Sequence, residues 1–134
     1  MRLVLDTSAA VCVVRRAPGW EDFDKVIQAA EWVESPDLFI AEAANVFWKF
    51  HGFGKLSVEN VEAALEQAVS IPDEFTPCAG LYREALALAI TGQRPAYDMF
   101  FLALARRNNA VLLSADRGLL DFAKKHDVKT FTSK

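Results

Sequence analysis

Short apolar runs alternate along the chain with longer segments in which apolar residues recur every three to four positions. The runs Arg2–Leu5, 38–40 and 110–113 have the length and composition of strands buried on both faces of a sheet. Helical spacing is found over residues 9–14, 20–33, 41–50, 57–71, 78–90, 99–105 and 119–125. Residues 75–76 and 128–132 are predicted to be short edge strands. This alternation predicts an α/β fold with a parallel sheet covered on both faces.

Length and composition restrict the class of protein further. The 134 residues are predicted to form one domain, 1–134, since no repeat, linker or low-complexity tract divides them. No apolar run approaches the roughly 18 residues that span a bilayer, and Asp6 interrupts the first apolar run before any signal-peptide pattern develops. We therefore expect a cytoplasmic protein with no membrane contact. The net charge of −3 excludes a strongly basic nucleic-acid coat, but it does not exclude a metal-dependent enzyme of nucleic acids.

Acidic residues follow all three predicted inner strands. Asp6 comes directly after the first strand, Glu42 two residues after the run 38–40, and Asp116 three residues after the run 110–113. If these strands are parallel, the three acids lie along the carboxyl edge of the sheet, where ligands of such folds bind. Asp98 precedes the apolar helix 99–105, and the spacing alone leaves open whether that helix begins at the same edge.

The chemistry of such a cluster favours a hard divalent cation. Carboxylates gathered without a cation repel one another and raise each other's pKa. Oxygen ligands suit Mg²⁺ or Mn²⁺, whereas zinc usually recruits histidine or cysteine. The candidate zinc ligands lie far apart in the sequence, at Cys12, Cys78, His51 and His126. Two such ions about 3.5–4 Å apart can direct water onto a phosphodiester without a protein base.

Four stretches together resemble one known family. LVLDTSA (3–9), IAEAANVF (40–47), YDMFFLALA (97–105) and LLSADRGLL (112–120) are similar, in order and spacing, to the motifs of PIN-domain nucleases. The similarity covers the whole chain and is greatest to the short members that act as VapC-type toxins of toxin–antitoxin pairs. It implies a three-layer α/β/α sandwich with a central parallel sheet of four to five strands.

The resemblance also implies a site and an activity. It places Asp98 at the acidic edge and assigns catalysis and the binding of Mg²⁺ or Mn²⁺ to Asp6, Glu42, Asp98 and Asp116. Ser8 and Ser114 match hydroxyl positions that orient the carboxylates, although threonine is commoner at the second position. The implied reaction is metal-dependent endoribonuclease cleavage of RNA, with tRNA and ribosomal RNA among family targets. The implied partners are a small antitoxin, often with a basic residue in the acidic site, and a second copy of the chain.

Other polar and aromatic residues have two interpretations each. Asn45, one turn after Glu42, is either a support for that acid or an exposed helical residue. Arg117, beside Asp116, is the preferred candidate for a phosphate contact, ahead of Arg15, Arg16, Arg94 and Arg106, and solvated surface is the alternative for each. The dense aromatic residues Phe47, Trp48, Phe50 and Phe53 cannot all share one core stripe, which suggests a subunit or antitoxin interface.

Three other functions were weighed against the nuclease. A haloacid dehalogenase-like phosphohydrolase requires a second aspartate two residues after the first, where this chain has Ser8. A response-regulator receiver requires two neighbouring acids before its phosphorylated aspartate and a lysine on a later strand, and neither is present. The remaining alternative is a catalytically weak PIN-fold module that binds RNA or protein.

Overall fold

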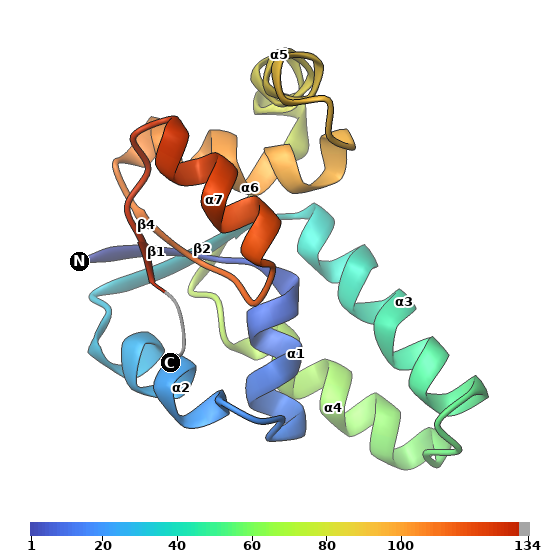
Figure 1. Ribbon diagram of the computed structural model, residues 1–134. Helices are drawn as coiled ribbons and strands as arrows, with labels where there is room; N and C mark the ends of the chain where they lie inside the picture. Colours follow the sequence, from blue (N-terminus) through green and yellow to red (C-terminus); the bar gives the residue numbers. More distant parts are fainter. Residues whose placement is uncertain (132–134) are drawn as a thin grey trace.

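A computed structural model describes residues 1–131 and contains a parallel five-stranded sheet with helices on both faces (Figure 1). The strands lie in the order β3-β2-β1-β4-β5, so the first strand of the chain is the central one. Their bounds are β1 (Arg2–Leu5), β2 (Trp32–Pro36), β3 (Glu74–Thr76), β4 (Val111–Leu113) and β5 (Thr130–Phe131). The predicted α/β sandwich with a parallel sheet of four to five strands is thereby confirmed.

The helices form two outer layers. In Figure 1, α1, α2 and α4 lie below the sheet and α5, α6 and α7 above it, while α3 extends outward from the end of β2. Their bounds are α1 (Thr7–Arg15), α2 (Trp20–Ala29), α3 (Leu38–Gly52), α4 (Val58–Ser70), α5 (Tyr82–Gly92), α6 (Ala96–Asn108) and α7 (Arg117–Lys125). A single 3₁₀ turn, Cys78–Gly80, precedes α5.

The middle of helix α6 is buried on nearly every side, as the apolar sequence of residues 99–105 predicts. Its residues 101–105 are at most 1% exposed, because one side of the helix packs on β1, β2 and β4 and the other side on α5. The central strand is equally enclosed, with Leu3, Val4 and Leu5 fully buried. These two elements fix the positions of Asp98, in the first turn of α6, and of Asp6, directly after β1.

The second strand of the prediction was wrong. Residues 38–40 lie in the first turn of α3, and the strand beside β1 is β2, which begins inside the predicted helix 20–33 and ends before the run 38–40. The predicted helix 20–33 accordingly ends earlier, at Ala29. A run of three apolar residues cannot distinguish a short strand from the start of a buried helix.

The strand β2 does not read as an apolar run, because it contains two buried polar residues. Glu34 is fully buried and accepts hydrogen bonds from Arg2 Nη2 and Asn108 Nδ2, both at 2.6 Å. Ser35 is also fully buried and donates to the carbonyl oxygen of Leu5 at 2.6 Å. Partners from β1 and α6 therefore satisfy polar groups that would otherwise be costly to bury.

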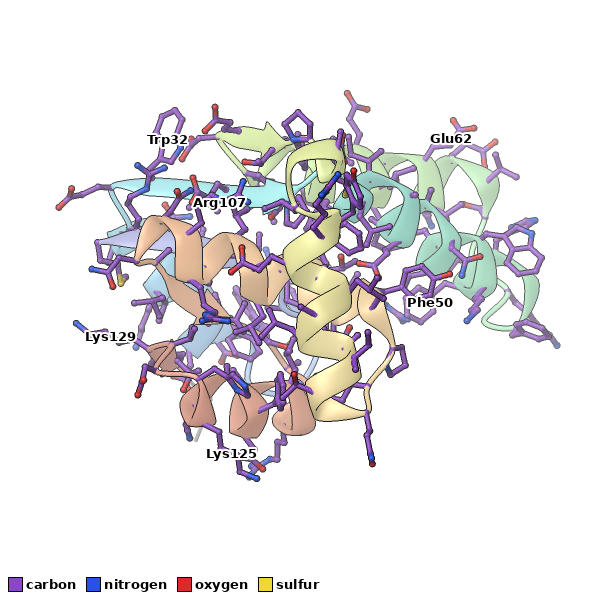
Figure 2. All side chains as sticks on the ribbon, turned by 90° about the horizontal axis from the view of Figure 1, so that it is seen from above. Trp32, Phe50, Glu62, Arg107, Lys125 and Lys129 are labelled. Atoms are coloured by element: carbon purple, nitrogen blue, oxygen red, sulfur yellow. The ribbon has the colours of Figure 1, made fainter. Side chains whose placement is uncertain are left out.

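The predicted edge strands were placed correctly. They are β3 and β5, the outermost strands of the sheet, although position 132 of the second prediction lies outside the described residues. Figure 2 shows Trp32, at the start of β2, and Lys129, before β5, on the side of the molecule opposite Phe50 of α3. The carboxyl ends of the strands therefore face the side on which α3 extends. Over residues 1–131, no helix is long and apolar enough to cross a membrane.

Candidate active site

The four predicted acids meet at the carboxyl edge of the sheet. Asp6 follows β1, Asp116 is the N-cap of α7, Asp98 lies in the first turn of α6, and Glu42 lies just after the first turn of α3. The charges of Asp98 and Asp116 raise the pKa of Asp6, and the charges of Asp6 and Asp98 raise the pKa of Glu42. Four segments that are distant in the sequence thus share one electrostatic site.

Serine hydroxyls hold the central carboxylate of this site. Asp6 Oδ2 accepts hydrogen bonds from Ser8 Oγ at 2.6 Å and from Ser114 Oγ at 2.7 Å. Each hydroxyl in turn accepts a backbone N–H at 3.0 Å, from Ala115 to Ser8 and from Asp116 to Ser114. The orienting position predicted for both serines agrees with these contacts, which join the end of β4 to the start of α1.

Burial dominates the electrostatics of Asp6. The side chain is only 5% exposed, and this burial raises the pKa of the carboxyl group well above its usual value. Hydrogen bonds from Ser8 and Ser114 oppose the shift, and the charges of Asp98 and Asp116 add to it. An ionised Asp6 is therefore destabilised in the protein alone, and a nearby cation would stabilise it.

Glu42 has a hydroxyl partner that the sequence reasoning missed. Thr7 Oγ1 donates to Glu42 Oε1 at 2.8 Å, linking the start of α1 to α3. Burial raises the pKa of Glu42 to about 7, against the opposing effect of the Thr7 hydrogen bond and with smaller contributions from Asp6 and Asp98. The available signal for Thr7 was its position directly after Asp6 in the motif LVLDTSA.

The other two acids share an arginine. Arg94 Nη2 lies 3.4 Å from Asp98 Oδ2 and 3.7 Å from Asp116 Oδ2. Burial and the charge of Asp116 raise the pKa of Asp98, and Arg94 opposes both effects. Asp116 also caps α7, since its Oδ1 accepts the N–H of Leu119 at 3.1 Å. One half of the site therefore contains a fixed positive charge, and the other half has only neutral hydroxyl donors.

Arg94 was one of the candidates for a phosphate contact, and in the structure it contacts Asp98 and Asp116. Arg117 is exposed in the first turn of α7, and its phosphate contact stays a prediction. Asn45 is exposed on α3, and its supporting role likewise stays a prediction. The sequence signal for Arg94 was its place four residues before Asp98, which is the spacing of an ion pair across one helical turn.

The remaining arginines and aromatic residues lie elsewhere. Arg15 stacks on Phe50 at 3.8 Å and Arg16 on Trp20 at 5.0 Å, while Arg106 approaches Glu84 at 4.0 Å. The expectation that the aromatic cluster cannot be wholly core is confirmed: Phe47 is 2% exposed, but Trp48 is 63% and Phe53 is 82% exposed.

The donor chemistry of the site fits a hard divalent cation. The acids and their hydroxyl partners present only oxygen atoms, which Mg²⁺ and Mn²⁺ prefer. In the arrangement that the structure describes for residues 1–131, no three acidic, histidine or cysteine side chains converge closely enough to enclose an ion. The side chains that could hold such an ion are Asp6, Glu42, Asp98 and Asp116.

The fold is a parallel α/β sandwich, and four carboxylates lie at the carboxyl edge of its sheet. These are the features that the resemblance to PIN domains implies. The chain belongs to the PIN domain family, whose model matches residues 3–125. It is 28% identical over 123 residues to Ribonuclease VapC3 of Pyrobaculum aerophilum, covering 90% of this chain and 94% of that one.

Solved structures agree with this fold. The crystal structure of PAE2754 from Pyrobaculum aerophilum has a TM-score of 0.75 at 23% identity and covers 97% of this chain and 89% of its own. The structure of VapBC2 from Rickettsia felis, bound to a DNA fragment from its promoter, has a TM-score of 0.66 at 15% identity, with 98% of each chain covered. At these identities the likeness concerns the fold alone.

Proposed function

We propose that this protein is a metal-dependent endoribonuclease that hydrolyses RNA phosphodiester bonds as the toxin of a toxin–antitoxin pair. The observation that carries the proposal is the meeting of Asp6, Glu42, Asp98 and Asp116 at one edge of a PIN-family sheet. The relative named Ribonuclease VapC3, matched over 90% of the chain, supports cleavage of RNA.

The four acids are the residues that would hold Mg²⁺ or Mn²⁺. When bound, such an ion lowers the pKa of an attacking water and stabilises the leaving oxygen. Ser8 and Ser114 hold Asp6 in one orientation, and Thr7 does the same for Glu42. Arg117 is exposed in the first turn of α7, and we propose that it contacts a phosphate of the RNA near Asp116.

We also propose a small cognate antitoxin, a homodimer and a cytoplasmic location. Trp48 and Phe53 leave apolar surface exposed at the far part of α3, which suits an apolar segment of an antitoxin. The VapBC2 structure from Rickettsia felis, a protein with this fold, supports a partner of that kind. On α5, Tyr82, Leu86 and Ile90 form an exposed stripe at helical spacing, which suits the same stripe of a second copy.

The direct test compares the wild-type protein with Asp6→Asn on structured RNA, such as a tRNA mixture, with and without Mn²⁺. We expect the wild type to cut internally only when the ion is present, and Asp6→Asn to be at least about 100-fold slower, because losing a metal ligand exceeds the loss of a supporting partner. The variant should stay folded, since asparagine removes a buried charge and retains the shape of the side chain.

Two outcomes would overturn the proposal. Intact RNA after incubation of antitoxin-free wild type with Mn²⁺ would favour the binding module over the nuclease. Equal cleavage by wild type and Asp6→Asn would show that the activity comes from another protein in the preparation.

A further inference from the structure

The backbone around Arg94 holds this residue in a fixed place between two helices. Gln93 ends α5 in the left-handed conformation with φ of 51°, and the N–H of Arg94 donates to the carbonyl of Ala89 at 3.1 Å. Pro95 follows at once as the N-cap of α6. The guanidinium is therefore carried by a short, constrained segment that ends at the acidic edge.

The guanidinium joins the N-termini of α6 and α7. Its Nη2 contacts Asp98 and Asp116, and its side chain is 25% exposed, less than either carboxylate. Its Nε is buried and finds no hydrogen-bond partner among residues 1–131. Such a placement is unfavourable for the guanidinium by itself, so attraction to the two carboxylates is the evident force that holds it there.

The first turn of α7 leaves space for this group. A Cβ added at Gly118 would lie 2.9 Å from Arg94 Nη1 and 3.3 Å from Asp116 Oδ1. Any larger residue at this position would push the guanidinium away from the carboxylate. The glycine and the arginine thus form one local arrangement around Asp116.

We propose that Arg94 is a positioning residue that acts as an internal cation of the acidic site, holding Asp98 and Asp116 and restricting the site to a single divalent ion on the side of Asp6 and Glu42. The inference rests on the metal dependence of the proposed function and adds the number of ions. One fixed positive charge beside Asp98 and Asp116 opposes the entry of a second divalent ion between them.

The test is a calorimetric titration of the full chain with Mn²⁺, accompanied by electron paramagnetic resonance, which detects the magnetic coupling of two neighbouring Mn²⁺ ions. We expect one ion and no coupling for the wild type. Arg94→Met removes the charge but retains an unbranched side chain, and it should bind a second ion at least about tenfold more tightly than the wild type. That estimate follows because a charge within about 4–6 Å changes the proton affinity of a carboxylate by 1–3 pKa units.

Three further variants separate charge from position. Arg117→Met removes an exposed charge beside Asp116 and should leave the ion count at one. Arg94→Lys retains a charge at this point and should also bind one ion. Gly118→Ala keeps Arg94 but displaces its guanidinium, so it should resemble Arg94→Met in part, and alanine suits a helical position.

The outcomes distinguish this inference from the proposed function. Two coupled ions in the wild type, or one ion in both the wild type and Arg94→Met, would overturn the role of Arg94 and leave metal-dependent cleavage standing. An equal gain in Arg94→Met and Arg117→Met would also overturn it, since general charge would then explain the effect. RNA cleavage by the wild type in excess chelator would overturn both. If Arg94→Met only weakens RNA binding, the residue is a phosphate contact.

Discussion

The acidic site has two halves, Asp6 with Glu42 and Asp98 with Asp116, and its partly buried carboxylates are stabilised differently in each half. In the hydroxyl half, Asp6 and Glu42 receive neutral donors from serine and threonine, and their pKa values stay raised. In the arginine half, Asp98 and Asp116 share the charge of Arg94, which opposes the raised pKa of Asp98 without removing the shift. A hydroxyl orients a carboxylate without neutralising it, so the hydroxyl half keeps its demand for a cation. The four acids are therefore unequal, although the sequence pattern presents them as equivalent.

The largest contrast comes from removing one support from each half. Ser114→Ala deletes a donor to Asp6 and an acceptor for the N–H of Asp116, so we expect Mn²⁺ binding to weaken by about 10–100-fold. Arg94→Met is expected to change the affinity in the opposite direction. Ser35→Ala, which removes a buried serine that donates to the Leu5 carbonyl, is the matched control for stability. Changes of the same sign in both halves would contradict the comparison.

A smaller effect concerns the pH dependence of stability without a divalent ion. Folding raises the pKa of Glu42 from 4.5 to about 7, so the stability due to its protonated form is present below pH 4.5 and is lost as the pH rises through about 7. Glu42→Gln should match the wild type near pH 4.5 and exceed it by about 1 kcal/mol at pH 8, after allowance for solvent screening of a partly exposed group.

Denaturant unfolding in chelator at several pH values measures this difference. Thr7→Val removes the hydrogen bond that lowers the pKa of Glu42 and should shift the midpoint to higher pH. If the difference in stability between Glu42→Gln and the wild type does not change with pH, the pKa of Glu42 is not raised by folding and the prediction is wrong.

The smallest expected effect belongs to the exposed arginine. Arg117→Met should weaken RNA binding only severalfold and lower the slope of affinity against salt by about one unit, as loss of one phosphate contact does. Filter binding of an uncleaved RNA to the Asp6→Asn background, at several salt concentrations, measures both quantities. If Arg117→Met abolishes RNA binding, Arg117 is essential for binding and the prediction of a single, minor phosphate contact is wrong.

The elements that could be predicted from sequence are those in which composition and surroundings agree. Residues 3–5 of β1 and 101–105 of α6 are apolar and buried, and Asp6 follows directly from the end of β1. The spacing left the edge of Asp98 open, and the family resemblance placed it beside Asp6. Glu42 was placed correctly beside Asp6 even though its supposed strand was helical, because α3 begins directly after the true strand β2.

The missed features depend on partners distant in sequence. Glu34 and Ser35 resemble a turn until Arg2, Asn108 and the Leu5 carbonyl are placed around them. The periodicity of apolar residues does not predict hydrogen bonds between residues so far apart in the sequence. The bridge from Arg94 to Asp116 is equally non-local, whereas its ion pair with Asp98 was visible in the spacing.

The outermost strand β3 has a consequence for how the protein behaves at high concentration. It spans three residues, so this border of the sheet offers only a short row of unpaired backbone groups. Pro77 directly after β3 has no N–H with which to extend that row. Long, flat borders promote fibrous aggregation by recruiting strands from other molecules. The shortness of β3 should keep this border of the sheet from recruiting strands in that way.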